Sequence, residues 1–545
     1  MTPPPCPSPR RGSAVETEPA AQHLGVDPGL NNRSVGEYGL SMGAPNILMV
    51  MADQLAPHFT STYGHEVVKT PNLDALAERG ARFDNAYCHS PLCAPARFTM
   101  LSGQPVSAIG AWDNASEFPA ATPTFAHHLS LAGYRTVLSG KMHFVGPDQM
   151  HGFEERLTTD IYPADFAWTP NWERADERID KWYHNMDVLQ DAGHAVTTYQ
   201  LDYDEEVGFA ARRKLLDIAR DDDDRPFFLC ASFIHPHDPY VARPEFWDLY
   251  DHDDIDMPEP WDLDSLDPHT LRIRTGIQAD TVGYTDEQVR MARHGYYANV
   301  SYFDDQLGKL LTTLEETGRA DDTIVIVTSD HGDMLGDRGT WFKMSFHERS
   351  ARVPLVVVGP DVANTAVSNA CSHLDFLPTL LALAGAEPHT DVTGRSLVPA
   401  WSGDADPIDE TFGEYMGEMT SHPMFMIRRG QYKYIHCATD PAQLYDVAND
   451  PLERTNLADD PAHSGAAAEF AAEVAKRWDE DDIRARVIAS QRERHFLHRA
   501  MSSGPLVSWD HQPTPDASNQ YVRNHQDWAE SGPKMRFPRF DPGQP

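Results

Sequence analysis

The stretch from Ser90 to Gly103 carries the residues whose chemistry is most evident. Within it, Cys93, Pro95 and Arg97 form a Cys-x-Pro-x-Arg motif. Proline is well accepted in the first turn of a helix, where its missing N–H has no partner to lose, so the motif predicts a helix that starts beside Cys93. The unpaired N–H groups of a helix start favour an anion at residue 93, and the permanent charge of Arg97 lies one turn away. The pattern indicates an activated residue 93; the alternative is a small buried cysteine in an ordinary helix cap.

Further polar residues follow four apolar runs that predict buried strands, at 47–51, 134–138, 226–234 and 323–328. Helical patterns alternate with these runs, which favours an α/β fold with an open, mostly parallel sheet. Ligands of such sheets bind at the carboxyl ends of the strands. A single Asp at a strand end is often only a helix cap, but several polar ends together indicate a site. The residues concerned are Asp53 and Gln54, Lys141 and His143, His235, Asp330 and His331, with Lys343 in a later loop.

Two of these strand ends predict a metal site. Asp53 and Asp330 supply carboxylates, Gln54 an amide oxygen and His331 an imidazole. Ligands that are mostly oxygen suit a hard divalent ion such as Ca²⁺ or Mg²⁺, and the imidazole leaves Mn²⁺ open.

The cysteine motif, followed by Ser102-Gly103, resembles the signature of the type I sulfatases. In that family this Cys is oxidised to formylglycine by a modifying enzyme that reads the Pro and the Arg. Longer stretches at 140–149, 157–170, 235–243 and 509–513 resemble the choline sulfatases, and the resemblance runs from about residue 45 into the tail. It implies an alkaline-phosphatase-like sulfatase fold, with a large mixed, mostly parallel sheet between helices, a smaller C-terminal α+β subdomain and an extended tail.

The resemblance also implies the cofactors. Formylglycine derived from Cys93 would be the nucleophile and a further metal ligand, and Arg97 would hold it in place. The family binds one divalent cation, which favours Ca²⁺ here, with Mn²⁺ and Mg²⁺ as alternatives. Most members have Asp-Asp and Asp-Asn where this chain has Asp53-Gln54 and Asp330-His331. That difference matches the branch that includes choline sulfatases and phosphonate monoester hydrolases.

Four more residues receive catalytic roles through the same resemblance. Lys141 and Lys343 would bind the sulfate oxygens as point charges. His235, with Lys343, would assist departure of the alcohol, and His143 would accept a proton from residue 93. Considered alone, either histidine is more simply a hydrogen-bonded structural side chain.

The aromatic region 151–200 bears on the substrate. A quaternary ammonium makes no conventional hydrogen bonds, so aromatic faces and carboxylates bind it. The resemblance implies a cation pocket, with one carboxylate contributed by a neighbouring subunit, since family members are tetramers. For the tryptophan among its members, core packing is the alternative. The expected members are Trp168, His184, Asn185, Glu418 and, from the neighbouring subunit, Asp510.

Together these features predict an enzyme that hydrolyses choline-O-sulfate to choline and sulfate. One alternative is a phosphonate monoester or phosphodiester hydrolase on the same fold. Another is a non-catalytic binder of quaternary amines, if Cys93 stays a thiol. A formylglycine-generating enzyme is the expected protein partner, and a homotetramer the expected assembly.

Composition limits the other partners. The 545 residues carry a formal net charge of −38, which argues against nucleic acid and anionic membranes as partners. No apolar run approaches a membrane span, and the N-terminal stretch has no apolar core of a signal peptide. Six scattered cysteines fit reduced thiols. We therefore expect a cytoplasmic protein.

Length and local composition predict four segments. Residues 1–43 are rich in Pro, Gly, Ser and charge and read as a disordered extension. Residues 44–405 form the predicted catalytic domain, and 406–498 a subdomain with an antiparallel hairpin at 424–435. Residues 499–545 form a tail expected to take part in oligomerisation.

Overall fold

The computed structural model describes residues 43–175, 184–402, 408–505, 508–514 and 537. The predicted disordered extension therefore lies outside the described residues except for its last position, and the predicted tail lies largely outside them. The division of the remaining chain near residue 405 stays a prediction.

An eight-stranded sheet forms the centre of the molecule. The strands lie in the order β11-β2-β10-β9-β1-β7-β4-β5, and β9, β1, β7, β4 and β5 run parallel, whereas β10 is antiparallel to β9 and β2. The prediction of a large, mostly parallel sheet is confirmed. The bounds are β1 Asn46–Asp53, β2 Ala81–Phe83, β4 Arg135–Gly140, β5 Glu155–Arg156, β7 Phe227–Pro236, β9 Thr323–Ser329, β10 Leu355–Val358 and β11 Thr365–Val367.

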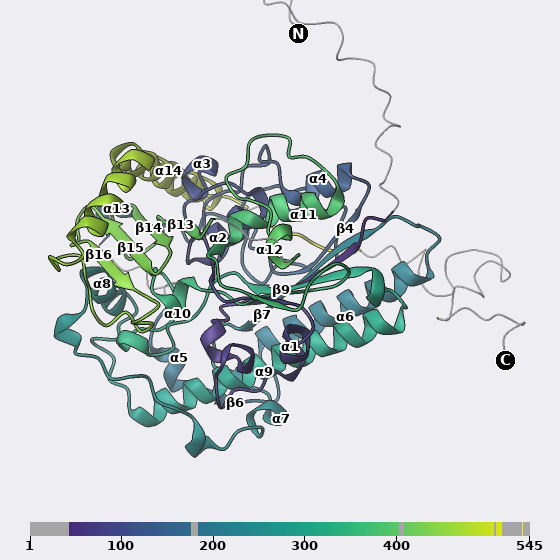
Figure 1. Cartoon of the computed structure of the whole chain (residues 1–545), viewed down its shortest axis with the longest axis horizontal. Helices are drawn as coiled ribbons and strands as arrows, with labels where there is room; N and C mark the ends of the chain where they lie inside the picture. Colours follow the sequence, from purple (N-terminus) through teal and green to yellow (C-terminus); the bar gives the residue numbers. More distant parts are fainter. Residues whose placement is uncertain (1–42, 176–183, 403–407, 506–507, 515–536, 538–545) are drawn as a thin grey trace, which may run out of the picture. The chain divides into compact units, whose positions relative to one another are not determined.

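Helices cover both faces of this sheet (Figure 1). α1, α6 and α9 lie on one face, and α2, α4 and α11 lie on the other. Strand β1, in the middle, is buried along its whole length, because the helices exclude water from both sides. The bounds are α1 Pro71–Ala77, α2 Cys93–Ser102, α4 Phe125–Leu131, α6 Tyr199–Arg220, α9 Asp286–Glu316 and α11 Phe376–Ala384.

The helix of the cysteine motif is α2, and it starts at Cys93 itself, after an extended Leu92. The sequence placed Cys93 just before the helix, so the observed start is slightly earlier. Gly103 ends α2 in a left-handed conformation with φ of 62°, which glycine adopts without strain. The first turn of α2 therefore faces the carboxyl edge of the sheet.

Strand β4 delivers the next polar residues through Gly140. This glycine has φ of 106°, and a Cβ atom there would lie 2.0 Å from the carbonyl oxygen of Ser232 on the neighbouring strand. Only glycine allows the chain to turn here directly into Lys141 and His143.

A second sheet follows in the chain. Its strands are antiparallel in the order β13-β14-β15-β16, and Gly430 in the β14–β15 turn has φ of 56°. The predicted hairpin is confirmed. In Figure 1, α13 and α14 lie beside this sheet. The bounds are β13 Glu410–Tyr415, β14 Met424–Arg429, β15 Tyr432–Cys437, β16 Gln443–Asp446, α13 Ser464–Arg477 and α14 Glu480–Met501.

A buried lysine joins the two sheets. Lys433 on β15 is fully buried, and its Nζ lies 2.8 Å from Glu348 Oε1 and 2.5 Å from Glu453 Oε1. Glu348 begins the short helix α10 Glu348–Ala351, which follows the loop that holds Lys343. Because a buried lysine needs such partners, this cluster ties the second sheet to the catalytic loops.

Within the described ranges, each helix is too short or too polar to span a lipid bilayer. Cys88, Cys93, Cys230, Cys371 and Cys437 are free thiols, and each of them is buried.

Candidate active site

A cleft of about 320 Å³ opens beside Cys93 at the carboxyl edge of the large sheet. Six of the residues predicted from the sequence line it. The lining residues are Cys93, Asn114, Tyr162, Trp168, His184, Asn185, Val188, Gln200, His237, Asp238, Pro239, Lys343 and Glu418.

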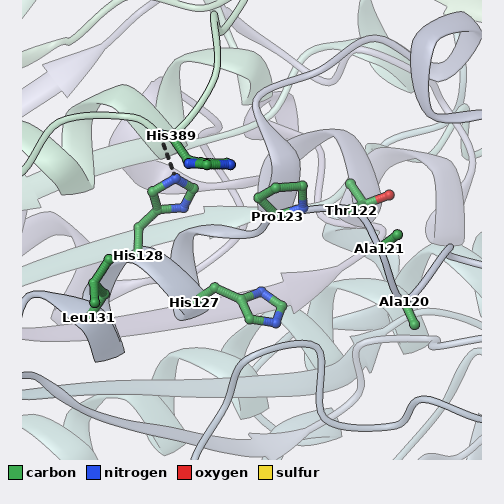
Figure 2. Close-up of a pocket in the computed structure, with 8 residues that line it drawn as sticks. All are labelled: Ala120, Ala121, Thr122, Pro123, His127, His128, Leu131 and His389. Atoms are coloured by element: carbon green, nitrogen blue, oxygen red, sulfur yellow. Dashed lines mark hydrogen bonds between the residues drawn. The ribbon is translucent and has the colours of Figure 1, made fainter. Parts of the chain in front are cut away.

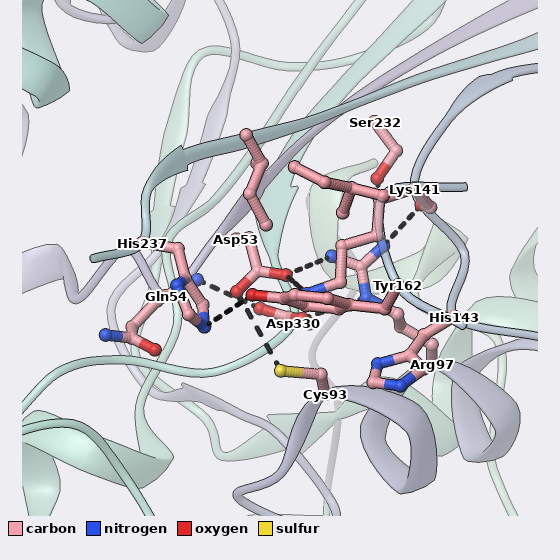
Figure 3. A network of polar contacts seen from close by, with 12 residues as sticks. Asp53, Gln54, Cys93, Arg97, Lys141, His143, Tyr162, Ser232, His237 and Asp330 are labelled. Atoms are coloured by element: carbon pink, nitrogen blue, oxygen red, sulfur yellow. Dashed lines mark hydrogen bonds and ion pairs between the residues drawn. The ribbon is translucent and has the colours of Figure 1, made fainter. Parts of the chain in front are cut away.

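Four side chains at the base of the cleft form a candidate metal site. One ligand atom each from Asp53, Cys93, Asp330 and His331 lies within 4.8 Å of the others, and all four side chains are buried. The Cys93 sulfur is 3.2 Å from His331 Nε2. It is 4.0 Å from Asp53 Oδ1 (Figure 3). The strand ends of β1 and β9 and the start of α2 therefore meet at one point, as predicted.

The donor set fits a divalent cation. Two carboxylates supply oxygen ligands, as hard cations require. His331 Nδ1 lies 3.0 Å from the carbonyl oxygen of Gly332, so in the neutral ring Nδ1 donates there and Nε2 keeps its lone pair toward the cluster. Gln54, the remaining predicted ligand, accepts a hydrogen bond through Oε1 from Lys343 Nζ at 2.6 Å and donates to Asp333 at 2.7 Å.

Arg97 forms an ion pair with each of the two carboxylates, those of Asp53 and Asp330. Its Nε donates to Asp330 at 2.9 Å, its Nη2 donates to Asp53 at 2.9 Å, and its Nη1 donates to the carbonyl of Lys141 at 2.6 Å. The side chains of Arg97, Asp53 and Asp330 have no solvent exposure. The guanidinium of Arg97 is therefore held by acceptors of the protein itself, and it fixes the positions of the two carboxylates relative to each other.

The surroundings of residue 93 favour an anion. Burial alone would raise the pKa of the Cys93 thiol, but Lys141, Lys343 and His331 lower it well below its ordinary value. Lys141 also donates to Asp53. This positive field is local, since the chain as a whole is strongly acidic.

Two histidines lie next to this field. The ring of His143 is buried, and neither of its nitrogens has a hydrogen-bond partner among the described residues. The ring nevertheless lies close enough to Cys93 to lower the pKa of the Cys93 thiol. His237 Nε2 lies 3.1 Å from Lys343 Nζ, and its Nδ1 lies 2.8 Å from the carbonyl oxygen of Asp238. In the neutral ring, therefore, Nδ1 carries the proton and Nε2 accepts.

The opposite part of the cleft is aromatic and acidic. The Tyr162 and Trp168 rings lie 5.0 Å apart between centroids, and His143 lies 5.8 Å from Trp168. Glu418 is buried, and its Oε2 has no hydrogen-bond partner among the described residues. Burial, reinforced by Asp113, raises the pKa of Glu418 to about 7.

Two predicted residues lie elsewhere. His235 is not part of the cleft lining; its Nδ1 lies 2.6 Å from Asp204 Oδ2 on α6, which also accepts the His235 backbone N–H. His237, two residues later, lines the cleft. Asp510 accepts the N–H of Ala164 within the same chain at 2.9 Å, and it does not line the cleft either.

Several lining residues were not predicted as site residues. Asn114 accepts the N–H of Ala94 at 3.0 Å and so satisfies the first turn of α2. Tyr162 and His237 stand in stretches that resemble the choline sulfatases, and the second histidine in His235-Pro236-His237 was a signal that could have pointed to His237. Val188, Gln200 and Asp238 carried no signal of their own.

A second pocket, of about 290 Å³, has three imidazoles among its lining residues (Figure 2). His128 Nδ1 lies 2.8 Å from the Thr124 carbonyl oxygen, and its Nε2 accepts the N–H of His389 at 3.0 Å, so this ring is fully engaged. Carbon atoms of Ala120, Pro123 and Leu131 make up much of the rest. The pocket has no carboxylate and no lysine or arginine among its lining residues, unlike the cleft at Cys93.

Comparison with known proteins agrees with this geometry. Residues 45–386 match the family model Sulfatase, 336–480 match N-sulphoglucosamine sulphohydrolase, C-terminal, and 485–537 match Choline sulfatase enzyme C terminal. The choline-sulfatase of Rhizobium meliloti is 47% identical over 92% of this chain and 100% of its own length. The arylsulfatase of Clostridium perfringens is 29% identical over 76% of this chain and 90% of its own length.

Solved structures show the same fold. The phosphonate monoester hydrolase of Agrobacterium radiobacter superposes with a TM-score of 0.65 at 24% identity, over 81% of this chain and 96% of that one. The predicted alkaline-phosphatase-like sulfatase fold is thus confirmed. The family model covers most of the chain and places the Cys93 cluster within its range, so this chain belongs to the sulfatase family and is a sulfuric ester hydrolase.

Proposed function

We propose that this enzyme hydrolyses choline-O-sulfate to choline and sulfate. The observation that carries the proposal is the division of one cleft into two ends. The base, at Cys93, is lined by fixed cations, whereas the wall formed by Tyr162, Trp168 and Glu418 offers aromatic faces and a buried carboxyl group. A substrate with a sulfate at one end and a quaternary ammonium at the other is complementary to both.

The cofactors belong to the base of the cleft. Formylglycine made from Cys93 by a formylglycine-generating enzyme would supply an oxygen nucleophile in place of the thiol. Asp53, Asp330, His331 and residue 93, whose ligand atoms lie close together, would hold one divalent cation. Gln54 is the further oxygen ligand proposed from the family resemblance, and Ca²⁺ is proposed in preference to Mn²⁺ or Mg²⁺ because carboxylate and amide oxygens dominate this set. Bound there, the cation supplies Lewis acidity toward the sulfate oxygens.

The protein's own residues bind the sulfate group and transfer the protons of the reaction. Lys141 and Lys343 place positive charge beside residue 93 and bind the sulfate oxygens. His143, with unpartnered ring nitrogens, accepts a proton from residue 93. Lys343 Nζ donates to the departing alcohol oxygen, and His237 Nε2, 3.1 Å away, accepts from that ammonium group and holds it in place.

The other end of the cleft binds the cation. The faces of Tyr162 and Trp168 attract a trimethylammonium group, and ionised Glu418 supplies the opposite charge. His184, which stacks on Phe342 at 4.3 Å, and Asn185 complete the wall. Asp510 accepts the N–H of Ala164 in its own chain. For a partner's Asp510 to join this wall, the homotetramer proposed from the family resemblance would be needed.

The first prediction concerns substrate preference. We expect kcat/KM on choline-O-sulfate to exceed that on a phenyl phosphonate monoester by at least about 100-fold, equivalent to about 2.7 kcal/mol. The reason is that the phosphonate has no cation to fill the aromatic end. Steady-state kinetics on both compounds test this, and a preference for the phosphonate would establish the rival hydrolase instead.

The second prediction concerns residue 93. The peptide that contains it should be lighter than the unmodified peptide by about 18 Da, the difference between CH₂SH and CHO. Cys93→Ala should lower turnover to background, while Cys437→Ala, a buried thiol in the second sheet, should leave it unchanged. Peptide mass mapping and kinetics measure both. A protein with an unmodified Cys93 that binds choline without turnover would be the non-catalytic binder.

The third prediction concerns Trp168. Trp168→Ala should raise KM for choline-O-sulfate by about 5- to 30-fold, as expected for the loss of a desolvated cation–π contact of about 1–2 kcal/mol. KM for an uncharged aryl sulfate should change less than about threefold, since that ester places no cation against the ring. Equal losses on the two esters would refute the cation pocket.

The fourth prediction concerns pH. Because the pKa of Glu418 is raised to about 7, its carboxyl group is neutral below that pH and ionised above it. KM for choline-O-sulfate should therefore rise as pH falls through 7, while the sulfate charge stays constant. In Glu418→Gln, KM should be high and should lose this dependence. Persistence of the wild-type pH profile in this variant would assign the titration to another group.

A further inference from the structure

The side chain of Asp160 is only 5% exposed, and Asp160 is not among the residues that line the cleft. Its Oδ2 accepts the backbone N–H of Met142 at 3.0 Å and of His143 at 2.8 Å, and the Nη2 of Arg156 at 2.8 Å. Its Oδ1 accepts the N–H of Ile161 at 2.9 Å and of Tyr162 at 3.4 Å. A carboxylate offers about four lone-pair directions, so these five donors use its full capacity.

The loop that Asp160 holds has an unfavourable backbone conformation. His143 has φ of 59°, in the left-handed region that is unfavourable for a residue with a side chain. Two successive N–H groups, at Met142 and His143, point at the same carboxylate oxygen. Hydrogen bonds to a charged acceptor are about twice as strong as neutral ones, so Asp160 can offset the strain at His143.

The same carboxylate fixes the facing wall. Tyr162 lies two residues after Asp160; its ring centroid is 4.4 Å from Lys141 Nζ and 5.2 Å from the His143 ring. Its hydroxyl lies 3.4 Å from His237 Nε2. One carboxylate therefore sets the distance between the 141–143 loop, at the sulfate end, and Tyr162, at the cation end.

The hydrogen-bond and charge partners of Asp160 keep its carboxyl group ionised. Burial by itself raises the pKa of Asp160, but Arg156, His143 and the two backbone N–H groups outweigh burial and bring the pKa below its ordinary value. Arg156 is anchored in turn, because its Nη1 donates to Gln149 Oε1 at 2.7 Å and its carbonyl oxygen lies 3.1 Å from His511 Nε2 in the tail.

We propose that Asp160 is a positioning residue of the sulfatase reaction: it holds the 141–143 loop in its strained conformation and at a fixed distance from Tyr162, so that Lys141 and His143 face residue 93. The proposal rests on the roles of Lys141 and His143 in the proposed function. It does not depend on the identity of the alcohol, because Lys141 and His143 are proposed to act on the sulfate group and on residue 93.

The fifth prediction tests this on an uncharged aryl sulfate. Asp160→Asn removes one acceptor oxygen and introduces a donor toward an N–H group, so kcat should fall about 10- to 100-fold with KM within about threefold of wild type. Asp165→Asn is the matched control and should leave kcat unchanged, since Asp165, in the same loop, accepts only the N–H of Ala167, at 2.9 Å, among the hydrogen bonds of the described residues. Peptide mass mapping first confirms equal conversion of Cys93 in all variants.

Two further measurements separate positioning from a general loss of stability. Hydrogen exchange of the peptide 141–145 should speed up at least tenfold in Asp160→Asn, while exchange in strand β9 should not change. The kcat of the double variant with His143→Ala should equal that of His143→Ala within about threefold, because Asp160 acts through the loop that carries His143. A kcat within twofold of wild type in Asp160→Asn, or fully multiplicative losses in the double variant, would overturn the proposal.

If Asp160→Asn does not fold, Asp160→Glu replaces it. This variant keeps the charge and moves the oxygens by one methylene, so positioning requires a similar loss of kcat, and a wild-type kcat would overturn the proposal. Failure of the wild type to convert choline-O-sulfate, with normal conversion of the aryl sulfate, would remove the proposed function and leave the role of Asp160 intact.

Discussion

The active site depends on the pairing of Arg97 with Asp53 and Asp330. Two carboxylates from different strands stand side by side without solvent, and desolvation alone would drive at least one of them to take up a proton. A guanidinium never loses its charge in a protein and presents its donors in a fixed plane, so it can hold both. Because Arg97 is one turn along α2 from Cys93, the same ion pairs also fix the start of the helix against the sheet. The position of residue 93 and the charge around it thus have one physical cause.

Much of this arrangement could be predicted from the sequence, because its causes are local. Continuous apolar runs predicted β1, β4, β7 and β9, and parallel strands bring their carboxyl ends to one edge, so Asp53 and Asp330 had to meet. The end of α2 at Gly103 followed from the requirement for a left-handed residue. The hairpin of the second sheet followed from alternation around Gly430.

Other parts depend on contacts between distant segments, which no local pattern reveals. His235 and His237 both follow the apolar run of β7, and only the contact of His235 with Asp204, 31 residues earlier on α6, decides which of them faces the cleft. His235 lies outside the cleft lining for that reason, and its predicted role in catalysis stays a prediction. Asp510 illustrates the same point: its contact with Ala164 joins segments 346 residues apart. The buried link of Lys433 to Glu348 likewise depends on how the two sheets meet.

The electrostatics of the cleft explain how an acidic protein can bind an anion. A net charge of −38 repels a sulfate ester at long range, but salt screens that repulsion beyond about 10 Å. In the proposed function the buried Lys141 and Lys343 attract the sulfate at contact distance. A zwitterion is repelled less than a simple anion, and its ammonium end is attracted by the same acidic surface. Entry with the sulfate leading would bring that group to the lysines at Cys93 while the cation stays beside Tyr162, Trp168 and Glu418. The acidity of the chain and the two-ended cleft therefore select the same kind of substrate.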